Sequence, residues 1–296
     1  FGAVLQGSLF GMAGLLPASY TTLIMSGQGL AGSFAAFAMI CAIASGSDLH
    51  DSAFGSFLTA CTVIFMCILL YVVLPKLVKQ RNTHILLPNS LEYNKNEATD
   101  QTKRQKISVV KIFKKIWLLA LSACCTLTIT IGIFPAITAD TKTSLTDNGS
   151  WDQYFVPISC FLLLNLCDWG GRSLTALCMW SRKDSLLLPG MIECHVIFIP
   201  LFMLCNVQPH LHLPVLFYHD AFFILFMTLF AFSNGYLASL CMCFGPKKVL
   251  PHEAETAGTI MAFFLSLGLA LGAALLSEQL FKTKSDKKSE NNIKEL

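Results

Sequence analysis

The sequence carries little charge. Only 13% of its 296 residues are Asp, Glu, Lys or Arg, whereas 54% are hydrophobic and the mean hydropathy is +0.60. Ordinary soluble domains contain about 25% charged residues, so this composition excludes that class and predicts a membrane protein. The net charge of +3 arises from one loop and one tail rather than from a patterned basic face, so we expect no nucleic-acid partner.

Metal-binding and catalytic patterns are also missing. The 12 cysteines show no C-x-x-C spacing, and every one lies in an apolar segment, where free cysteine behaves as a small hydrophobe. We therefore expect no disulfide, no metal and no cofactor. Because no nucleophile with a base, no paired carboxylates and no phosphate-binding loop can be recognised, we do not expect an enzyme.

The features of a signal peptide are missing as well. The chain starts at Phe1, its first 17 residues are already apolar, and neither a charged n-region nor a cleavage site precedes them. This pattern indicates a chain that begins inside a membrane span and is truncated at its amino end.

Long apolar runs fill most of the sequence. Closed barrels would alternate in segments of about 10 residues, so unbroken runs predict helices and an all-α polytopic membrane protein. Eight segments are expected to span the bilayer: 1–17, 28–47, 53–74, 116–137, 154–180, 187–207, 221–244 and 257–276.

One long polar loop divides these segments. We expect residues 1–75 to hold three spans at the end of an amino-terminal bundle and residues 116–276 to hold a carboxy-terminal bundle of five spans. The loop 76–115 is predicted to be a flexible linker, and 277–296 a polar tail.

The distribution of Lys and Arg predicts the orientation. The loop 76–115 contains ten of them, which places it in the cytoplasm, and alternation then puts the carboxyl end outside. Asn148 begins an N-x-S sequon on the side assigned as outside, where it would be a glycosylation acceptor.

The segment 154–180 contains polar residues at helical spacing. Phe161, Asn165, Asp168 and Arg172 follow one another at steps of 4, 3 and 4, so they share one helix face and the two charges can pair. A charge at the centre of a span costs about 2.5 to 3.5 kcal/mol on insertion scales and usually faces a bundle interior or a watery cavity. Two interpretations remain open: an ion pair that only fixes helix packing, or a polar ligand site inside the membrane, which we favour.

Three further polar residues lie in apolar segments. Gln6 carries an amide that must find a partner on another helix or on a ligand. Glu193 and His195, near the start of the sixth segment, could form a proton relay, but the sequence favours side chains that reach out to the membrane interface.

Several stretches of the chain resemble the equilibrative nucleoside transporters, in particular the mammalian plasma-membrane type that is sensitive to nitrobenzylthioinosine. The resemblance rests on FGAVLQGSLFG at 1–11, LPASYTTLIMSGQGLAG at 16–32, AMICAIASGS at 38–47, the D-x-x-G-R of 168–172 and FSNGYLASLCMCFGPKKV at 232–249. It covers nearly the whole chain except the large loop and the residues after about 276.

This resemblance implies a facilitative carrier, a uniporter of the solute carrier class that exchanges purine and pyrimidine nucleosides such as adenosine and uridine across the plasma membrane. Its fold would be a major-facilitator-like helical bundle of eleven spans, of which this chain would hold about eight. The amino end would be cytoplasmic and the carboxyl end extracellular.

The resemblance also implies a substrate site between the two bundles. Asp168 and Arg172 would hold the ribose hydroxyls, Phe161 and Asn165 would line the same wall, and Leu269 would supply apolar packing.

The base would be read from the first segment. Gln6 would hydrogen-bond the nucleobase, with Gly2 and Ser8 beside it.

Two alternatives to a facilitative carrier stay open. The chain could be a truncated fragment that transports nothing. It could also be a proton-coupled nucleoside carrier in which Asp168 or Glu193 titrates.

Overall fold

The computed structural model describes residues 2–45, 49–85, 108–135, 138, 141, 154–179, 190, 192, 195–205 and 216–294. Helices account for most of these residues, and the prediction of an all-α fold is confirmed. The helices, in chain order, are α1 (Gly2–Gly14), α2 (Ala18–Ala44), α3 (Leu49–Ile85), α5 (Val109–Ile133), α7 (Leu163–Leu177), α9 (Phe198–Met203), α10 (Asp220–Lys247) and α11 (Ala254–Lys294). A π-helical segment, η2 (Val156–Leu162), precedes α7, and a 3-10 turn, η3 (Pro251–Glu253), precedes α11.

Four helices in the described part of the chain are long and apolar enough to cross a bilayer. They comprise α2, α5, α10 and the stretch Pro251–Glu278 that begins at η3. Several such helices in one chain make it a multi-pass membrane protein.

Several helices extend well beyond the predicted apolar segments, and α2 already begins at Ala18, whereas the predicted segment begins at 28. Helix α3 continues to Ile85, α5 begins at Val109, and α11 continues to Lys294 through residues expected to form only a polar tail. Lys, Arg, Glu and Gln are good helix formers, so a helix can continue after its hydrophobicity ends. Residues 86–107, the centre of the predicted linker, lie outside the described residues.

The chain divides into two compact units, residues 1–40 with 109–296 and residues 41–108. The second unit contains α3, whose apolar side chains from 57 to 73 are exposed all around the helix. A helix that is hydrophobic on every side requires lipid or protein around it. The exposure therefore agrees with a membrane-spanning α3.

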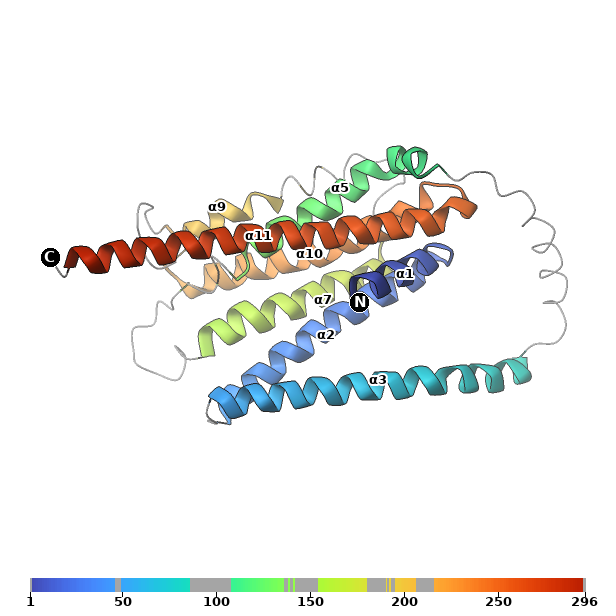
Figure 1. Ribbon diagram of the computed structural model, residues 1–296, viewed down its shortest axis with the longest axis horizontal. Helices are drawn as coiled ribbons and strands as arrows, with labels where there is room; N and C mark the ends of the chain where they lie inside the picture. Colours follow the sequence, from blue (N-terminus) through green and yellow to red (C-terminus); the bar gives the residue numbers. More distant parts are fainter. Residues whose placement is uncertain are drawn as a thin grey trace. The chain divides into compact units, whose positions relative to one another are not determined.

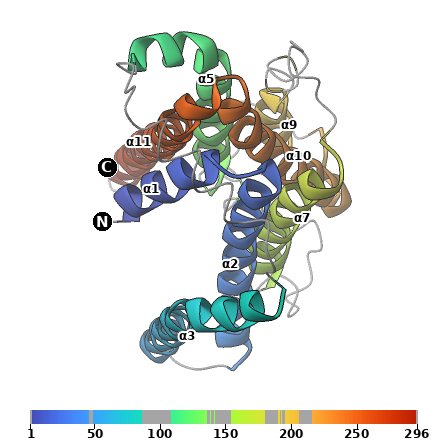
Figure 2. The ribbon, with the colours of Figure 1, turned by 90° about the vertical axis from the view of Figure 1, so that its right-hand side faces the viewer.

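Helix α10 is the central helix of the first unit. It packs against α5, α7, α9 and α11, and α1 packs along α11 (Figures 1 and 2). Every residue of α10 from 234 to 246 is buried, as expected for a helix that is apolar on all faces. Prolines lie in the turns between these helices: Pro17 lies between α1 and α2, and Pro251 lies between α10 and α11. Proline disfavours the continuation of a helix because it lacks a backbone N–H.

Two hydrophobic cores lie along α10. The first joins α1, α5, α10 and α11 through residues such as Phe10, Ile116 and Leu240. The second joins η2, α9 and the first half of α10, where Phe202 and Phe230 stack edge to face at 5.5 Å. Asp168 of α7 faces α10, where its carboxylate accepts a hydrogen bond from Asn234.

Candidate functional site

Asp168 and Arg172 lie one turn apart near the middle of the helical stretch that η2 and α7 form together. Pro157 lies in the first turn of η2, where its missing N–H is tolerated. The wide π-helical turn of η2 includes Phe161 and ends where α7 begins. Such turns are frequent at functional sites because they change the direction of side chains locally.

The two charges form a buried ion pair, as the spacing predicts. Nε of Arg172 donates to Oδ2 of Asp168 at 2.6 Å, and the two side chains are only 13% and 11% exposed. Nη1 of Arg172 lies 4.0 Å from Sδ of Met25, which is a weak acceptor. Among the described residues, no oxygen accepts a hydrogen bond from the terminal guanidinium nitrogens, so donors remain for a ligand.

A second helix holds the other carboxylate oxygen. Nδ2 of Asn234, on α10, donates to Oδ1 of Asp168 at 2.6 Å. Oδ1 of Asn234 accepts from the Thr130 hydroxyl of α5 at 2.7 Å. Thr130, Asn234, Asp168 and Arg172 thus form one hydrogen-bonded chain across α5, α10 and α7, which we call the polar chain.

Helix α2 meets the opposite side of α7 through hydroxyl and indole groups. Nε1 of Trp169 donates to Oγ of Ser26 at 3.1 Å, and Ser26 shares a second hydrogen bond of 2.8 Å with Ser173. Gly32 faces the side-chain oxygen of Asn165 so closely that a Cβ would overlap it. The absence of a side chain at Gly32 therefore allows α2 to approach Asn165.

Two glycines bring α7 and α10 together at the ion pair. A Cβ at Gly171 would overlap the backbone carbonyl of Phe232, and one at Gly235 would overlap the backbone carbonyl of Asp168. Small residues at such positions let membrane helices approach backbone to backbone. This close approach is what brings Asn234 within hydrogen-bond distance of Asp168.

A family model described as nucleoside transporter matches residues 1–277. The chain belongs to the nucleoside transporter family.

Curated relatives agree with this assignment. The chain is 55% identical to equilibrative nucleoside transporter 1 of Homo sapiens over 92% of its own length and 64% of the relative. It is 53% identical to equilibrative nucleoside transporter 1 of Rattus norvegicus, over 93% of the chain and 65% of the relative. For equilibrative nucleoside transporter 2 of Homo sapiens the identity is 46%, over 93% and 68%. The chain therefore spans a little under two thirds of the first two relatives, and all three are named as transporters rather than enzymes, as the sequence predicts.

Two more of the residues expected to bind substrate lie earlier in the η2 and α7 stretch of this nucleoside transporter family member. The ring of Phe161 packs edge to face against Phe134 at 5.0 Å, and Asn165 donates from Nδ2 to the Phe161 carbonyl at 2.8 Å. Both are half-buried, and Asn165 faces Gly32 of α2. One hydrogen bond thus joins Phe161 to Asn165 and another joins Asp168 to Arg172, but none among the described residues links the two pairs, so a shared site stays a prediction.

The other four expected residues lie on α1 and α11. Gln6 is half-buried, Gly2 is exposed, and Ser8 is exposed with its hydroxyl on the Val4 carbonyl at 2.9 Å. Leu269 is 40% exposed on α11. No hydrogen bond within the described part of the chain joins these residues to Asp168 or Arg172, so their membership of the site stays a prediction.

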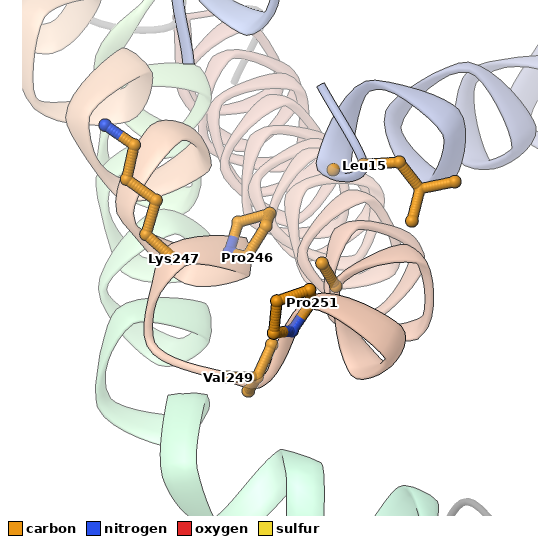
Figure 3. Close-up of a pocket in the computed structure, with 7 residues that line it drawn as sticks. Leu15, Pro246, Lys247, Val249 and Pro251 are labelled. Carbon is orange, nitrogen blue, oxygen red and sulfur yellow. The ribbon is translucent and has the colours of Figure 1, made fainter. Parts of the chain in front are cut away.

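One described pocket lies away from the polar chain. It has a volume of about 430 Å³ and is lined by Gly14, Leu15, Pro246, Lys247, Val249, Pro251 and Ala254, at the ends of α1 and α10. Figure 3 shows the ammonium of Lys247 pointing away from the other labelled side chains. It lies over the Phe244 ring instead, 5.6 Å from its centroid. No set of polar groups converges in this pocket, so we do not assign a ligand to it.

The expectation that His195 reaches the membrane interface is wrong. Its side chain is 1% exposed, stacks on Phe230 at 4.6 Å and shares a hydrogen bond of 3.0 Å between Nδ1 and Oγ of Ser233. The aromatic surface of the second core covers the ring, which a count of local charges does not reveal. Glu193 and the predicted glycosylation acceptor Asn148 lie outside the described residues.

A second ion pair lies at the end of the first unit where α5 begins. Nζ of Lys115 donates to Oε2 of Glu253 at 2.9 Å, and Glu253 also accepts from the Leu250 backbone N–H at 3.4 Å. The exposed Lys111 and Lys114 share this end of α5. Among the described residues, no group of three or more His, Cys, Asp or Glu side chains could hold a metal ion.

Sequence reasoning missed Asn234 and Thr130. Asn234 is a polar residue within an apolar run, as Asn165 is, and the same argument about a membrane amide applies to it. Thr130 gives no such signal, because threonine in a membrane helix usually bonds to its own backbone.

Proposed function

We propose that this chain carries nucleosides across the membrane without a coupled ion, as part of a facilitative transporter. The observation that supports the proposal is the Asp168–Arg172 pair, buried in the interior of a membrane bundle with guanidinium donors left over. Buried ion pairs add little net stability compared with apolar packing, so one inside a bilayer needs a functional reason.

The chemistry of the pair suits a ribose. Two neighbouring hydroxyls offer donors and acceptors together, so a carboxylate can accept from one while a guanidinium donates to the other. Asp168 keeps free lone pairs on both oxygens, and Arg172 keeps its terminal nitrogens. Together the pair is neutral, which agrees with uptake that needs no accompanying cation.

The rest of the site follows from the family resemblance. We infer that Phe161 and Asn165 line the ribose wall and that Leu269 contributes apolar packing.

In the same way, Gln6 would read the nucleobase, with Gly2 and Ser8 beside it. A Gln amide has one acceptor and two donors, which matches the mixed edge of a purine or a pyrimidine.

Transport would proceed by alternating access. The bundles 1–75 and 116–276 would rock around a midplane site, as in carriers built from helical halves. The gathering of Lys111, Lys114 and Lys115 at one end of the first unit supports a cytoplasmic location for that end. The plasma membrane, an extracellular carboxyl end and glycosylation at Asn148 are parts of the same proposal.

Uptake of labelled uridine into cells that lack their own nucleoside transport tests the proposal. We expect saturable uptake that unlabelled adenosine and uridine inhibit strongly. Uracil, which lacks the ribose, and 2′,3′-dideoxyuridine, which lacks the diol, should inhibit at least about tenfold more weakly, because buried polar groups without partners are penalised. Equal inhibition by uridine and dideoxyuridine would contradict the ribose assignment.

The chain spans 64% of the human relative's length, and a fragment that transports nothing is the alternative to test against. A version with further amino-terminal spans taken from that relative distinguishes a chain that transports by itself from a fragment that does not. If only the extended version takes up uridine, the fragment alternative holds for the chain as given. Uptake that rises as the medium is acidified would instead support a proton-coupled carrier.

A further inference from the structure

The carboxylate of Asp168 is held by three helices. Arg172, on its own helix, takes one oxygen, and Asn234 on α10 takes the other while bonding to Thr130 on α5. We propose that Asn234 and Thr130 are positioning residues: they hold the Asp168 carboxylate in the orientation that accepts a substrate hydroxyl. This inference rests on the proposed function of Asp168 and adds to it the residues that orient that carboxylate.

The direction of the Asn234 amide is determined by its neighbours. An ionised carboxylate can only accept, so the amide nitrogen must face Asp168 and the amide oxygen must face Thr130. The single proton of the Thr130 hydroxyl has two acceptors within reach, the Thr126 carbonyl at 2.8 Å and the Asn234 amide oxygen at 2.7 Å. Turning the amide over would set its oxygen against the Asp168 carboxylate, one acceptor against another, so the contact with Asp168 determines the orientation.

Burial protects the hydrogen bonds of Asn234 and Thr130 from water. Asn234 is 4% exposed and Thr130 is 5% exposed, so water does not compete for their hydrogen bonds. Gly235, next to Asn234, lets the α10 backbone contact the Asp168 carbonyl. The carboxylate is therefore oriented by α5 and α10 as well as by its own helix, and neither residue needs to touch the substrate.

Among the residues that the structure describes, few charged or titratable groups surround the polar chain. On α7 it is Arg172 that pairs with Asp168; α2 contributes the neutral Met25, and α5 the neutral Thr130. His195 reaches Ser233, the residue before Asn234, and stacks on Phe230. A second carboxylate at position 234 would therefore share the single Arg172 guanidinium with Asp168. Because two neighbouring negative charges repel each other, the two carboxylates would together bind a proton.

The hydroxyl of Thr130 gives the cleanest test. We expect Thr130→Val, which keeps the shape but removes the donor, to raise the KM for uridine by about fivefold while changing the maximal rate per transporter at the surface by less than about twofold. Thr130→Ser keeps the hydroxyl and should restore the KM. Thr126→Val is the matched control one turn away, because that hydroxyl bonds to the Ser122 carbonyl and not to the polar chain.

Asn234→Asp supplies an independent readout. Its uptake of uridine should be low at neutral pH and rise as the medium is acidified, when the two carboxylates share a proton. Without such a shift in the pH profile, the amide would have no role in orienting the carboxylate.

Selectivity for the ribose distinguishes positioning from general damage. In Thr130→Val, the ratio of inhibition by uridine to inhibition by 2′,3′-dideoxyuridine should fall towards one, whereas Thr126→Val should keep the ratio of the unaltered transporter. If Thr130→Val keeps that ratio and the KM, the positioning inference is wrong although the proposed function stands. If the unaltered transporter does not distinguish the two compounds, the ribose assignment itself fails.

Discussion

Two ion pairs among the described residues of the first unit lie in contrasting surroundings. Asp168 and Arg172 pair within α7, almost fully buried, and a third residue from another helix donates to the second carboxylate oxygen. Lys115 and Glu253 link α5 to the turn before α11; the lysine side chain is 35% exposed and the glutamate 9%. A pair with one exposed partner gains less from its attraction because water reaches and screens the exposed group, whereas a pair buried on both sides is costly to assemble and costly to break.

The contrast between the two ion pairs supports a role of the buried pair in binding rather than in helix packing. If a charge pair existed only to hold helices, the exposed pair between two elements would be the better device, since Lys115 and Glu253 join elements far apart in the sequence. The buried pair joins two residues of the same helix and so holds nothing together by itself. Its connection to α10 comes from Asn234.

The largest expected effect comes from removing the buried pair. Arg172→Ala should abolish uridine uptake, because the terminal guanidinium donors are lost and Asp168 is left as an unpaired buried charge, which costs about 3 to 5 kcal/mol. Surface labelling measures whether the protein reaches the membrane, which we expect it to do.

A double variant tells binding from packing. Asp168→Leu combined with Arg172→Met replaces the pair by apolar groups of similar size, and should recover stability relative to Arg172→Ala without recovering uptake. Melting of the detergent-solubilised protein and uridine uptake are measured on the same preparations. Uptake by the double variant at the level of the unaltered transporter would mean that the pair serves packing only.

The next effect concerns the close approach of α7 to α10. Gly171→Ala should destabilise the protein by about 1 to 3 kcal/mol and lower uptake, because the new methyl group overlaps the Phe232 carbonyl. Gly170→Ala is the matched control: its Cβ would lie 3.8 Å from the Phe232 ring, an ordinary contact, and alanine favours the helix. Thermal melting of both variants checks the prediction, which equal melting temperatures would contradict.

Sequence alone predicted the helical class and the ion pair, because hydrophobic runs and a four-residue spacing are local signals. It did not predict where α5 begins or where α3 and α11 end, since helix formers continue a helix into polar sequence. It also did not find Asn234 and Thr130, or the burial of His195. Their roles depend on which helices become neighbours, and that is set by glycine contacts far apart in the sequence.

The smallest effect is expected at the exposed pair. Lys115→Met should change uridine uptake by less than about twofold, because a screened pair contributes little and the methionine keeps the apolar stem. Glu253→Gln should behave alike, since its amide oxygen can still accept from the Leu250 backbone N–H. Any small change in melting temperature should vanish at high salt, where the attraction in the unaltered protein is screened as well. A tenfold loss of uptake in Lys115→Met with normal surface expression would show that this end pair also takes part in transport, and the difference between the two pairs would then be one of position rather than of role.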